Sequence, residues 1–262
     1  MKRENYHLHT TISDGKLKPE ELIKLAIKKN LDTICITDHY HLPPDFKEER
    51  NDFYSEKDYR TLRRLQVKYK NKINILVGVE FDWLKDHKEW TGKEASRKKY
   101  DYKLLSVHFL KSKGGYSFID LSEEGFDETI KKEGGIKKVV EAYYGGLREG
   151  IKTGYFDAVA HFDIIKIWNK DKKYFSGKEK WYESQVRETL KLIKKKSMKM
   201  EINTAGWRKP CNEQYPSEWI LKEALNRGIP ILIGTDGHKK EEIDYKLDEA
   251  YNLLKSLNRA SN

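Results

Sequence analysis

The chain has 262 residues, a formal net charge of +10, 37% hydrophobic residues and 36% charged residues. This length fits one α/β barrel or two small domains, because barrels of this type contain about 250 residues. No stretch reaches the roughly 20 apolar residues of a membrane span, and the N-terminal residues lack the apolar segment of a secretory signal, so we expect a cytoplasmic protein without a membrane partner.

The two cysteines and the distribution of charge exclude further classes of site. Cys35 lies in an apolar run and Cys211 in a polar one, without Cys-x-x-Cys spacing, so we expect neither a disulfide framework nor a thiolate zinc site. Lysines alternate with glutamates along the whole chain, which is typical of solvated helix faces. The alternative is a surface for an acidic partner, such as nucleic acid or a phosphorylated small molecule.

Seven short runs of apolar and β-branched residues predict strands. In chain order they are Asn5 to Thr10, Thr33 to Asp38, Asn74 to Phe81, Lys103 to Phe109, Ala158 to Phe162, Lys199 to Asn203, and Pro230 to Gly234. Most of them are separated by apolar residues at helical spacing. The first such helix is Pro19 to Asn30, and the later stripes centre on Leu62, Val140, Leu190, Ala224 and Ala250. This alternation favours parallel β-α units that close into a barrel, within one domain of residues 1–262.

Histidines and carboxylates stand where these predicted strands end. His7 and His9 are two residues apart, so they share one face of an extended strand. Six of the eight histidines occupy such ends, namely His7, His9, His39, His108, His161 and His238. In a parallel barrel these ends form one rim, where active sites lie. Nitrogen and oxygen ligands suit zinc, manganese or iron, and the residue types do not choose among them.

The ordered motifs HLHT with Ser13-Asp14-Gly15, ITDH, GVEFD, SVH, AHFD, EINTAG and GTDGH resemble the PHP (polymerase and histidinol phosphatase) superfamily. Within it, the chain is similar to the monofunctional histidinol-phosphate phosphatases, from His7 to His238. The resemblance implies a distorted seven-stranded (β/α)7 barrel with its active site at the C-terminal rim of the strands. It also implies three divalent metal ions, and the strand count agrees with the count made above.

Carried over by position, the resemblance assigns nine metal ligands. His7, His9, Glu80 and Asp236 would hold one ion; Glu80, His108 and His161 a second; Asp14, His39 and His238 a third. Only the resemblance selects Glu80 over Asp82, because both share one strand face. Asp82 and Asp163 stay open between ligands, residues that orient a metal-bound imidazole, and surface residues.

The charge of such a centre favours a phosphate substrate. Three divalent ions bring about six positive charges, and Asp14, Glu80 and Asp236 bring three negative charges. The excess of about three positive charges can be balanced by a hydroxide and a phosphate dianion. The resemblance implies a phosphomonoesterase of histidine biosynthesis that hydrolyses L-histidinol phosphate to L-histidinol and phosphate. A metal-bridging hydroxide would attack phosphorus, with Asp236, Glu80 and His161 as the catalytic residues.

Three further residues are candidates for substrate binding. Arg208 resembles the family's arginine near the phosphate, where a guanidinium can hold two oxygens, and the alternative is a surface arginine. His41 and Asp163 are alternative candidates for the proton donor to the leaving group, and the sequence does not choose between them. Asp120 lies in the connection Leu110 to Gly135, whose IDLSEEGF stretch resembles the histidinol phosphatase branch. Asp120 or Glu124 would meet the substrate's ammonium, unless this connection is a solvent-exposed charged loop.

Two other functions are alternatives. A PHP phosphoesterase acting on nucleotides or nucleic-acid 3′ ends would suit the basic charge, although no nucleic-acid-binding module is recognisable, so we expect no nucleic-acid partner. A non-catalytic PHP interaction domain would lack ligands, whereas all nine positions are filled here. Nothing in the sequence indicates an oligomeric state.

Overall fold

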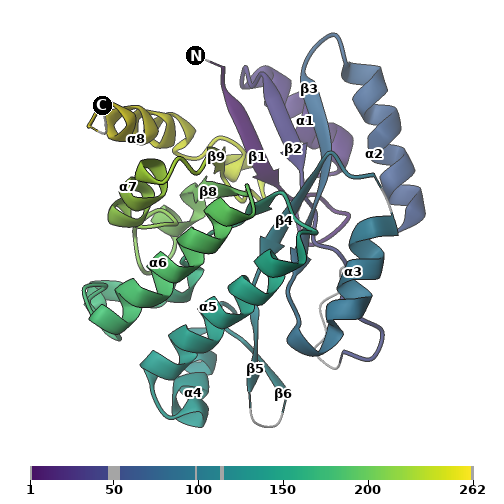
Figure 1. Cartoon of the computed structure of the whole chain (residues 1–262). Coiled ribbons are helices and arrows are strands. Elements are labelled where there is room, and N and C mark those ends of the chain that lie inside the picture. Colours follow the sequence, from purple (N-terminus) through teal and green to yellow (C-terminus); the bar gives the residue numbers. More distant parts are fainter. Residues whose placement is uncertain (1, 47–53, 98, 113–114, 261–262) are drawn as a thin grey trace.

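Seven parallel strands curl into a barrel in the computed structural model, which describes residues 2–46, 54–97, 99–112 and 115–260 (Figure 1). The strand order is β1-β2-β3-β4-β7-β8-β9. Their bounds are Glu4–Leu8, Thr33–Ile36, Asn74–Asp82, Tyr102–Ser106, Ala158–Val159, Lys199–Asn203 and Ile231–Gly234. The backbone N–H of Asp236 donates to the His7 carbonyl, and that of His9 to the Gly237 carbonyl, both at 3.0 Å. These bonds join the first strand to the segment after the last, and the predicted barrel is confirmed.

Helices surround the barrel, as Figure 1 shows. They are α1 Pro19–Lys28, α2 Glu56–Tyr69, α3 Lys88–Arg97, α4 Glu123–Glu133, α5 Ile136–Thr153, α6 Lys180–Lys195, α7 Glu218–Asn226 and α8 Leu247–Ala260. The sequence did not predict α3 and α4, because their apolar stripes are sparse; Phe126 and Thr129 are the buried residues of α4. No helix in the described ranges is long and apolar enough to cross a membrane.

The core has two parts, inside and outside the barrel. A small cluster contains strand residues and Ala160 just after β7, with Cys35 and Leu104 among its members, and fills the barrel interior. The larger core lies between strands and helices. All four residues of β2 are buried, as expected for a parallel strand covered on both faces.

The first strand departs from simple alternation. Strand alternation would place Tyr6 and Leu8 together on the face opposite His7 and His9, but Tyr6 packs with the interior cluster and Leu8 with the outer core. The pairing register of β1 shifts between Asn5 and Leu8, and an irregularity of this kind turns side chains to a different face. His7 and His9 nevertheless end with their Nε2 atoms 3.0 Å apart.

The described part of the connection Leu110 to Gly135 forms a hairpin and a helix rather than a plain loop. The predicted strand Lys103 to Phe109 divides, because β4 ends at Ser106 and β5 begins at Phe109. An antiparallel hairpin of β5 (Phe109–Ser112) and β6 (Gly115–Phe118) follows, then α4; positions 113 and 114 lie outside the described residues. In Figure 1 this hairpin lies at the end of the barrel opposite both chain termini, where it brings Phe118 and Asp120 to the cavity described next.

Candidate metal centre and active site

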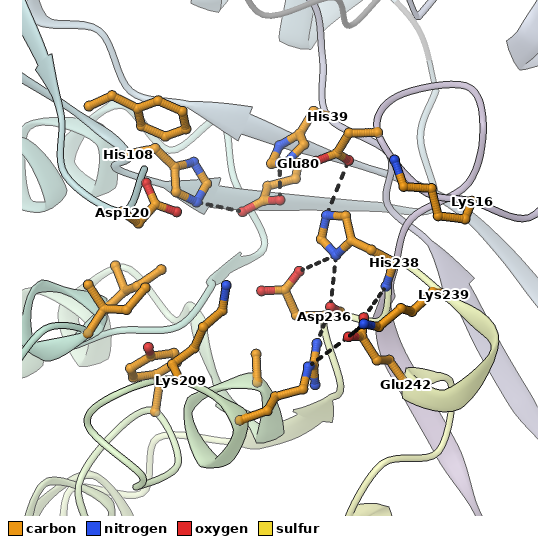
Figure 2. Close-up of a pocket in the computed structure, with 17 residues that line it drawn as sticks. Lys16, His39, Glu80, His108, Asp120, Lys209, Asp236, His238, Lys239 and Glu242 are labelled. Atoms are coloured by element: carbon orange, nitrogen blue, oxygen red, sulfur yellow. Dashed lines mark hydrogen bonds and ion pairs between the residues drawn. The ribbon is translucent and has the colours of Figure 1, made fainter. Parts of the chain in front are cut away.

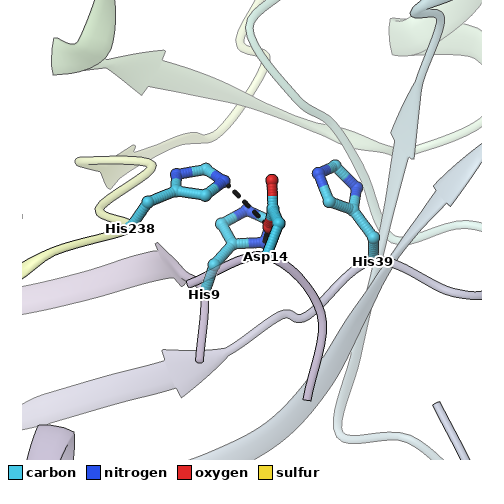
Figure 3. Close-up of side chains that lie close together, drawn as sticks. All are labelled: His9, Asp14, His39 and His238. Carbon is cyan, nitrogen blue, oxygen red and sulfur yellow. Dashed lines mark ion pairs between the residues drawn. The ribbon is translucent and has the colours of Figure 1, made fainter. Parts of the chain in front are cut away.

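The predicted histidines and carboxylates meet at the C-terminal rim, beside one cavity of about 570 Å³ (Figure 2). Ligand atoms within 4.8 Å of one another form three overlapping groups: His9, Asp14, His39 and His238; His7, His9 and Asp236; and His39, Glu80 and His108. Figure 3 shows the first group. The overlap means that His9 and His39 each belong to two groups. The structure thus brings together the nine positions that the resemblance assigned, with His161 joining them through Glu80.

Glu80 is the centre of this arrangement. Its Oε1 lies 2.9 Å from His161 Nε2 and 3.8 Å from His108 Nε2, and its Oε2 lies 3.1 Å from His7 Nε2, 3.2 Å from His39 Nδ1 and 3.4 Å from His9 Nε2. Glu80 is 1% exposed, so these imidazoles replace water around its carboxylate. Oε1 therefore faces two ring nitrogens and Oε2 faces three, and carboxylate and imidazole together are ligands that divalent metals accept.

Asp82 and Asp163, which the sequence left open, lie elsewhere. Asp82 Oδ1 is 2.7 Å from His108 Nδ1, so this carboxylate orients the ring and leaves Nε2 toward Glu80. Asp163 instead contacts Lys166 Nζ at 3.0 Å and accepts a hydrogen bond from the Ser217 backbone N–H at 3.0 Å. Asp82 therefore supports a candidate ligand, whereas Asp163 belongs to a neighbouring ion pair.

Asp236 is held in an unusual backbone conformation. Its φ is +50°, in the left-handed region that non-glycine residues seldom adopt. Arg208 donates from Nη1 to the Thr235 carbonyl at 2.9 Å and from Nη2 to the Asp236 carbonyl at 2.7 Å. Its Nε lies 3.3 Å from Glu242. This clamp directs Asp236 Oδ1 to within 3.2 Å of His9 Nε2.

The loop after β1 places Asp14. Asp38 Oδ1 accepts the Thr10 backbone N–H at 2.6 Å, and its Oδ2 accepts the Thr10 hydroxyl at 2.7 Å. The Ser13 hydroxyl donates to Asp38 at 2.8 Å. The loop therefore turns back on the strand end, and Asp14 Oδ1 lies 3.1 Å from His238 Nε2.

The electrostatics of the cluster depend on positive charge among buried carboxylates. Burial alone would lower the pKa of His7, but Glu201, Asp236 and Glu80 raise it well above its ordinary value. Burial would raise the pKa of Glu80, yet His39 and His7 hold it well below its usual range. Against the same burial, Asp82 raises the pKa of His108 to about 10. These carboxylates thus require compensating cations, either protons or metal ions.

The donor set fits divalent metal ions. His7 Nε2 and His9 Nε2 lie 3.0 Å apart, a spacing at which two lone pairs repel unless a cation or proton lies between them. Nδ1 of His9 and Nδ1 of His161 are buried without a hydrogen-bond partner among the described residues. Buried polar atoms are seldom left so in a purely structural cluster. Imidazole and carboxylate are also the ligands that zinc and related metals accept without cysteine.

The predicted substrate residues have different placements. Arg208 and Asp120 line the cavity, together with Phe118, Tyr215 and three lysines, Lys16, Lys209 and Lys239. His41 is not among the lining residues. Its ring lies 4.3 Å from that of Tyr40 and 5.6 Å from that of Trp90, measured between centroids. The structure thus brings two of the three candidates to the cavity and packs His41 against Tyr40 and Trp90.

Sequence reasoning missed Glu201 and Lys209. Glu201 is 1% exposed and its Oε1 lies 2.9 Å from His7 Nδ1. It stands two residues before Asn203 in β8, so strand parity could have placed both on one face, but nothing local indicated its partner. Lys209 follows Arg208 directly, and its signal was only the basic pair after a strand end.

Comparison with known proteins places this site in a family. The family model described as "PHP domain" matches residues 5–205. The chain is 27% identical to the histidinol-phosphatase of Bacillus subtilis over 94% of this chain and 97% of that protein.

Two solved structures share the fold. One is the putative histidinol phosphatase of Listeria monocytogenes, with a TM-score of 0.86 and 24% identity, covering 94% of this chain and 99% of that one. The other is the histidinol phosphate phosphatase of Lactococcus lactis, complexed with zinc, L-histidinol and phosphate, with a TM-score of 0.74 and 21% identity, covering 98% of this chain and 94% of that one. With its motifs, barrel and rim of histidines in place, this chain belongs to the PHP domain family.

Proposed function

We propose that this protein is a metal-dependent phosphomonoesterase that hydrolyses L-histidinol phosphate to L-histidinol and phosphate. The observation that carries the proposal is the meeting of five imidazoles with buried Glu80 beside a cavity that Asp120 also lines. Relatives of similar length named histidinol-phosphatase support the substrate. The Lactococcus lactis structure supports zinc as a metal that such a site accepts.

The proposed centre holds three divalent ions, with zinc, manganese and iron as candidates. The ligands we assign are those of the sequence analysis, and the contacts of Glu80, Asp236 and Asp14 with the surrounding imidazoles support them. Bound divalent ions supply Lewis acidity and lower the pKa of a bound water from about 15.7 to about 7. Their excess positive charge favours a phosphate dianion in the cavity.

The chain's own residues organise the reaction around this centre. Hydrolysis forms a bond from a water oxygen to phosphorus, breaks the ester P–O bond and delivers one proton to the leaving oxygen. Glu80 and His161 hold the centre, and Asp236, which lines the cavity, orients the attacking water by accepting its hydrogen bond. Glu80 and His161 are each 1% exposed, and burial of this kind strengthens electrostatic interactions between them.

Arg208 and Asp120 give the cavity two chemically different walls. A guanidinium has five N–H donors; Arg208 uses one each on Thr235, Asp236 and Glu242, so two remain for a phosphoryl oxygen. Asp120 Oδ1 is buried without a hydrogen-bond partner in the described ranges, and burial raises the pKa of its carboxyl. A substrate ammonium would satisfy this oxygen and restore its charge, while Phe118 and Tyr215 offer aromatic faces to an imidazole. We assign no role to His41.

The test is phosphate release by the metal-replete protein across L-histidinol phosphate, serine phosphate, nucleoside monophosphates and a short oligonucleotide. We expect at least about a hundredfold preference in kcat/KM for L-histidinol phosphate, roughly 2.7 kcal/mol of differential binding. Asp120→Asn should reduce that preference by at least about tenfold and leave hydrolysis of an alkyl phosphate that lacks an ammonium group nearly unchanged. Equal or greater activity on nucleotides or the oligonucleotide would overturn the substrate and retain the hydrolase.

A further inference from the structure

Strand β8 contributes none of the nine candidate ligands, yet its side chains contact three of them. Glu201 reaches His7 on β1 and His161 after β7, while the Asn203 amide lies 3.4 Å from Asp236. We propose that Glu201 is a positioning residue that sets the ring of His7 and the backbone of His161 simultaneously, so that metal affinity depends on it. This inference rests on the metal centre of the proposed function.

The first contact fixes the ring of His7. Glu201 Oε1 lies 2.9 Å from His7 Nδ1, and both side chains are at most 1% exposed. A carboxylate only accepts hydrogen bonds, so it places the ring proton on Nδ1. When a metal replaces the proton on Nε2, the lone pair of that nitrogen is available beside Glu80 Oε2, which lies 3.1 Å away. Glu201 thus selects the tautomer in which His7 can bind a metal.

The second contact holds the backbone of His161. The other carboxylate oxygen, Oε2, accepts the His161 backbone N–H at 2.8 Å. His161 has φ of +22°, a conformation that costs free energy for a residue with a side chain. The hydrogen bond to a buried carboxylate offsets part of this cost and keeps His161 Nε2 at 2.9 Å from Glu80. One carboxyl group therefore links two candidate ligands, one on β1 and one in the segment after β7.

Neighbouring residues are shaped around Glu201. Asn203 Nδ2 donates to Oε2 at 3.0 Å, which fixes the rotation of the carboxylate. Gly234 on β9 lies against Oε1, and a Cβ at that position would stand 1.9 Å from Oε1 and 2.6 Å from His7 Cβ. Because the φ of Gly234 is not in the left-handed region, the glycine is needed for space rather than for backbone freedom. The fold reserves this volume for the pair of Glu201 and His7.

Because three donors surround the Glu201 carboxylate, the variant Glu201→Gln tests the positioning role directly. His7 Nδ1, the His161 backbone and Asn203 Nδ2 all donate to this carboxylate. In Glu201→Gln the new NH₂ group must face at least one donor. If it faces His7, the ring must move its proton to Nε2 and loses the lone pair needed for metal; if it faces His161, the strained backbone loses its acceptor. Either orientation damages one ligand without changing side-chain volume.

The experiment measures zinc affinity of the full chain by competition with a fluorescent chelator after metal removal. We expect Glu201→Gln to bind zinc about 10- to 100-fold more weakly than the wild type, with kcat reduced and KM little changed. Glu201→Asp keeps the charge but shortens the reach, so it should fall between the two. If Glu201→Gln does not fold, Glu201→Asp decides the question by the same affinity measurement.

Asp101→Asn is the matched control, because Asp101 accepts the Val77 backbone N–H at 2.8 Å and a Gln66 side-chain N–H at 2.9 Å at the opposite end of the barrel. It should lower the midpoint of thermal unfolding without changing zinc affinity. Wild-type zinc affinity in the Glu201 variants, or an equal loss in the control, would overturn the positioning role. Absence of zinc binding by the wild type would instead overturn the metal centre and this inference with it.

Discussion

The two ends of the barrel use aspartates for different purposes. At the N-terminal end, Asp32, Asp101 and Asp157 immediately precede β2, β4 and β7. Each accepts a backbone N–H with Oδ2, from Arg3 at 2.7 Å, Val77 at 2.8 Å and Lys103 at 2.8 Å respectively. Each also donates its own backbone N–H to the carbonyl of that same residue. These reciprocal pairs fasten the starts of adjacent strands.

At the C-terminal rim Glu80, Asp236 and Asp14 face imidazoles. Glu80 and Asp236 are buried among histidines, and two rim residues, His161 and Asp236, have positive φ. Strain of this kind persists only where surrounding contacts determine it, as Glu201 and Arg208 do here. Carboxylates therefore stabilise one end of the barrel and, at the other end, form part of the candidate active site.

Removing one rim ligand should abolish function with little loss of fold. His161→Asn removes the imidazole but tolerates the left-handed backbone at this position. Metal and charge stabilisation of the transition state is worth several kcal/mol, and each 1.36 kcal/mol is tenfold, so kcat/KM should fall on the order of 10³-fold. Steady-state kinetics and thermal unfolding of the metal-free protein measure the two effects. Retained activity would remove His161 from the site.

Zinc binding at the rim should depend steeply on pH. Against the burial that lowers both values, Asp82 raises the pKa of His108 to about 10 and Asp14 raises that of His238 to about 9. Both imidazoles are therefore doubly protonated and positively charged at pH 7 in the metal-free protein, and metal binding must release the second proton of each ring. Zinc affinity should rise between pH 6 and pH 9, by up to about tenfold per pH unit for each proton released.

Calorimetry of zinc binding in buffers of different ionisation enthalpy counts these protons. The metal-free protein gives a second readout with the opposite sign. In the metal-free protein the ion pairs of protonated His108 and His238 with Asp82 and Asp14 stabilise the fold fully below about pH 6.5. This contribution to the free energy of unfolding should disappear as pH rises through the folded-state pKa values of about 9 to 10. Zinc affinity independent of pH, with no proton release, would contradict protonated rim histidines.

The sequence predicted the rim far better than its supports. Residues such as His7 and His238 were predictable, because histidines rarely follow several successive strands unless they belong to one functional site. Glu201 did not, since it lies within a buried strand and its partners come from β1 and from the segment after β7. Contacts across strands depend on register and on closure of the barrel, which local pattern does not contain.

The fold shows the same division. The seven strands followed from apolar runs, but the register shift in β1 leaves Tyr6 and Leu8 on different sides of the sheet, against simple alternation. The β5–β6 hairpin was absorbed into one predicted strand and a long loop, because Phe109 and Leu110 continue the apolar run of β4. The sequence predicted that Arg208 is either a phosphate ligand or a surface residue. It did not predict that Arg208 donates a hydrogen bond to the Asp236 carbonyl, because this contact depends on how the segment after β8 packs.

The smallest expected effect on function tests the N-terminal end. Asp101→Asn should leave kcat/KM unchanged and lower the free energy of unfolding by about 1–3 kcal/mol, since the carboxylate's hydrogen bonds are replaced by a group that also donates. Burial alone would raise the pKa of Asp101, but its bonds to Arg63, Val77 and Gln66 lower it.

The stability that Asp101 contributes is therefore present above the unfolded-state pKa of about 3.9 and is lost as pH falls through the lower folded-state value. Urea unfolding of both proteins should show the full difference at pH 7 and a shrinking one below about pH 4. If Asp101→Asn lost activity at pH 7 without losing stability, the division of roles between the two ends would be contradicted. Catalysis would then depend on a residue to which we assign only the joining of strand starts.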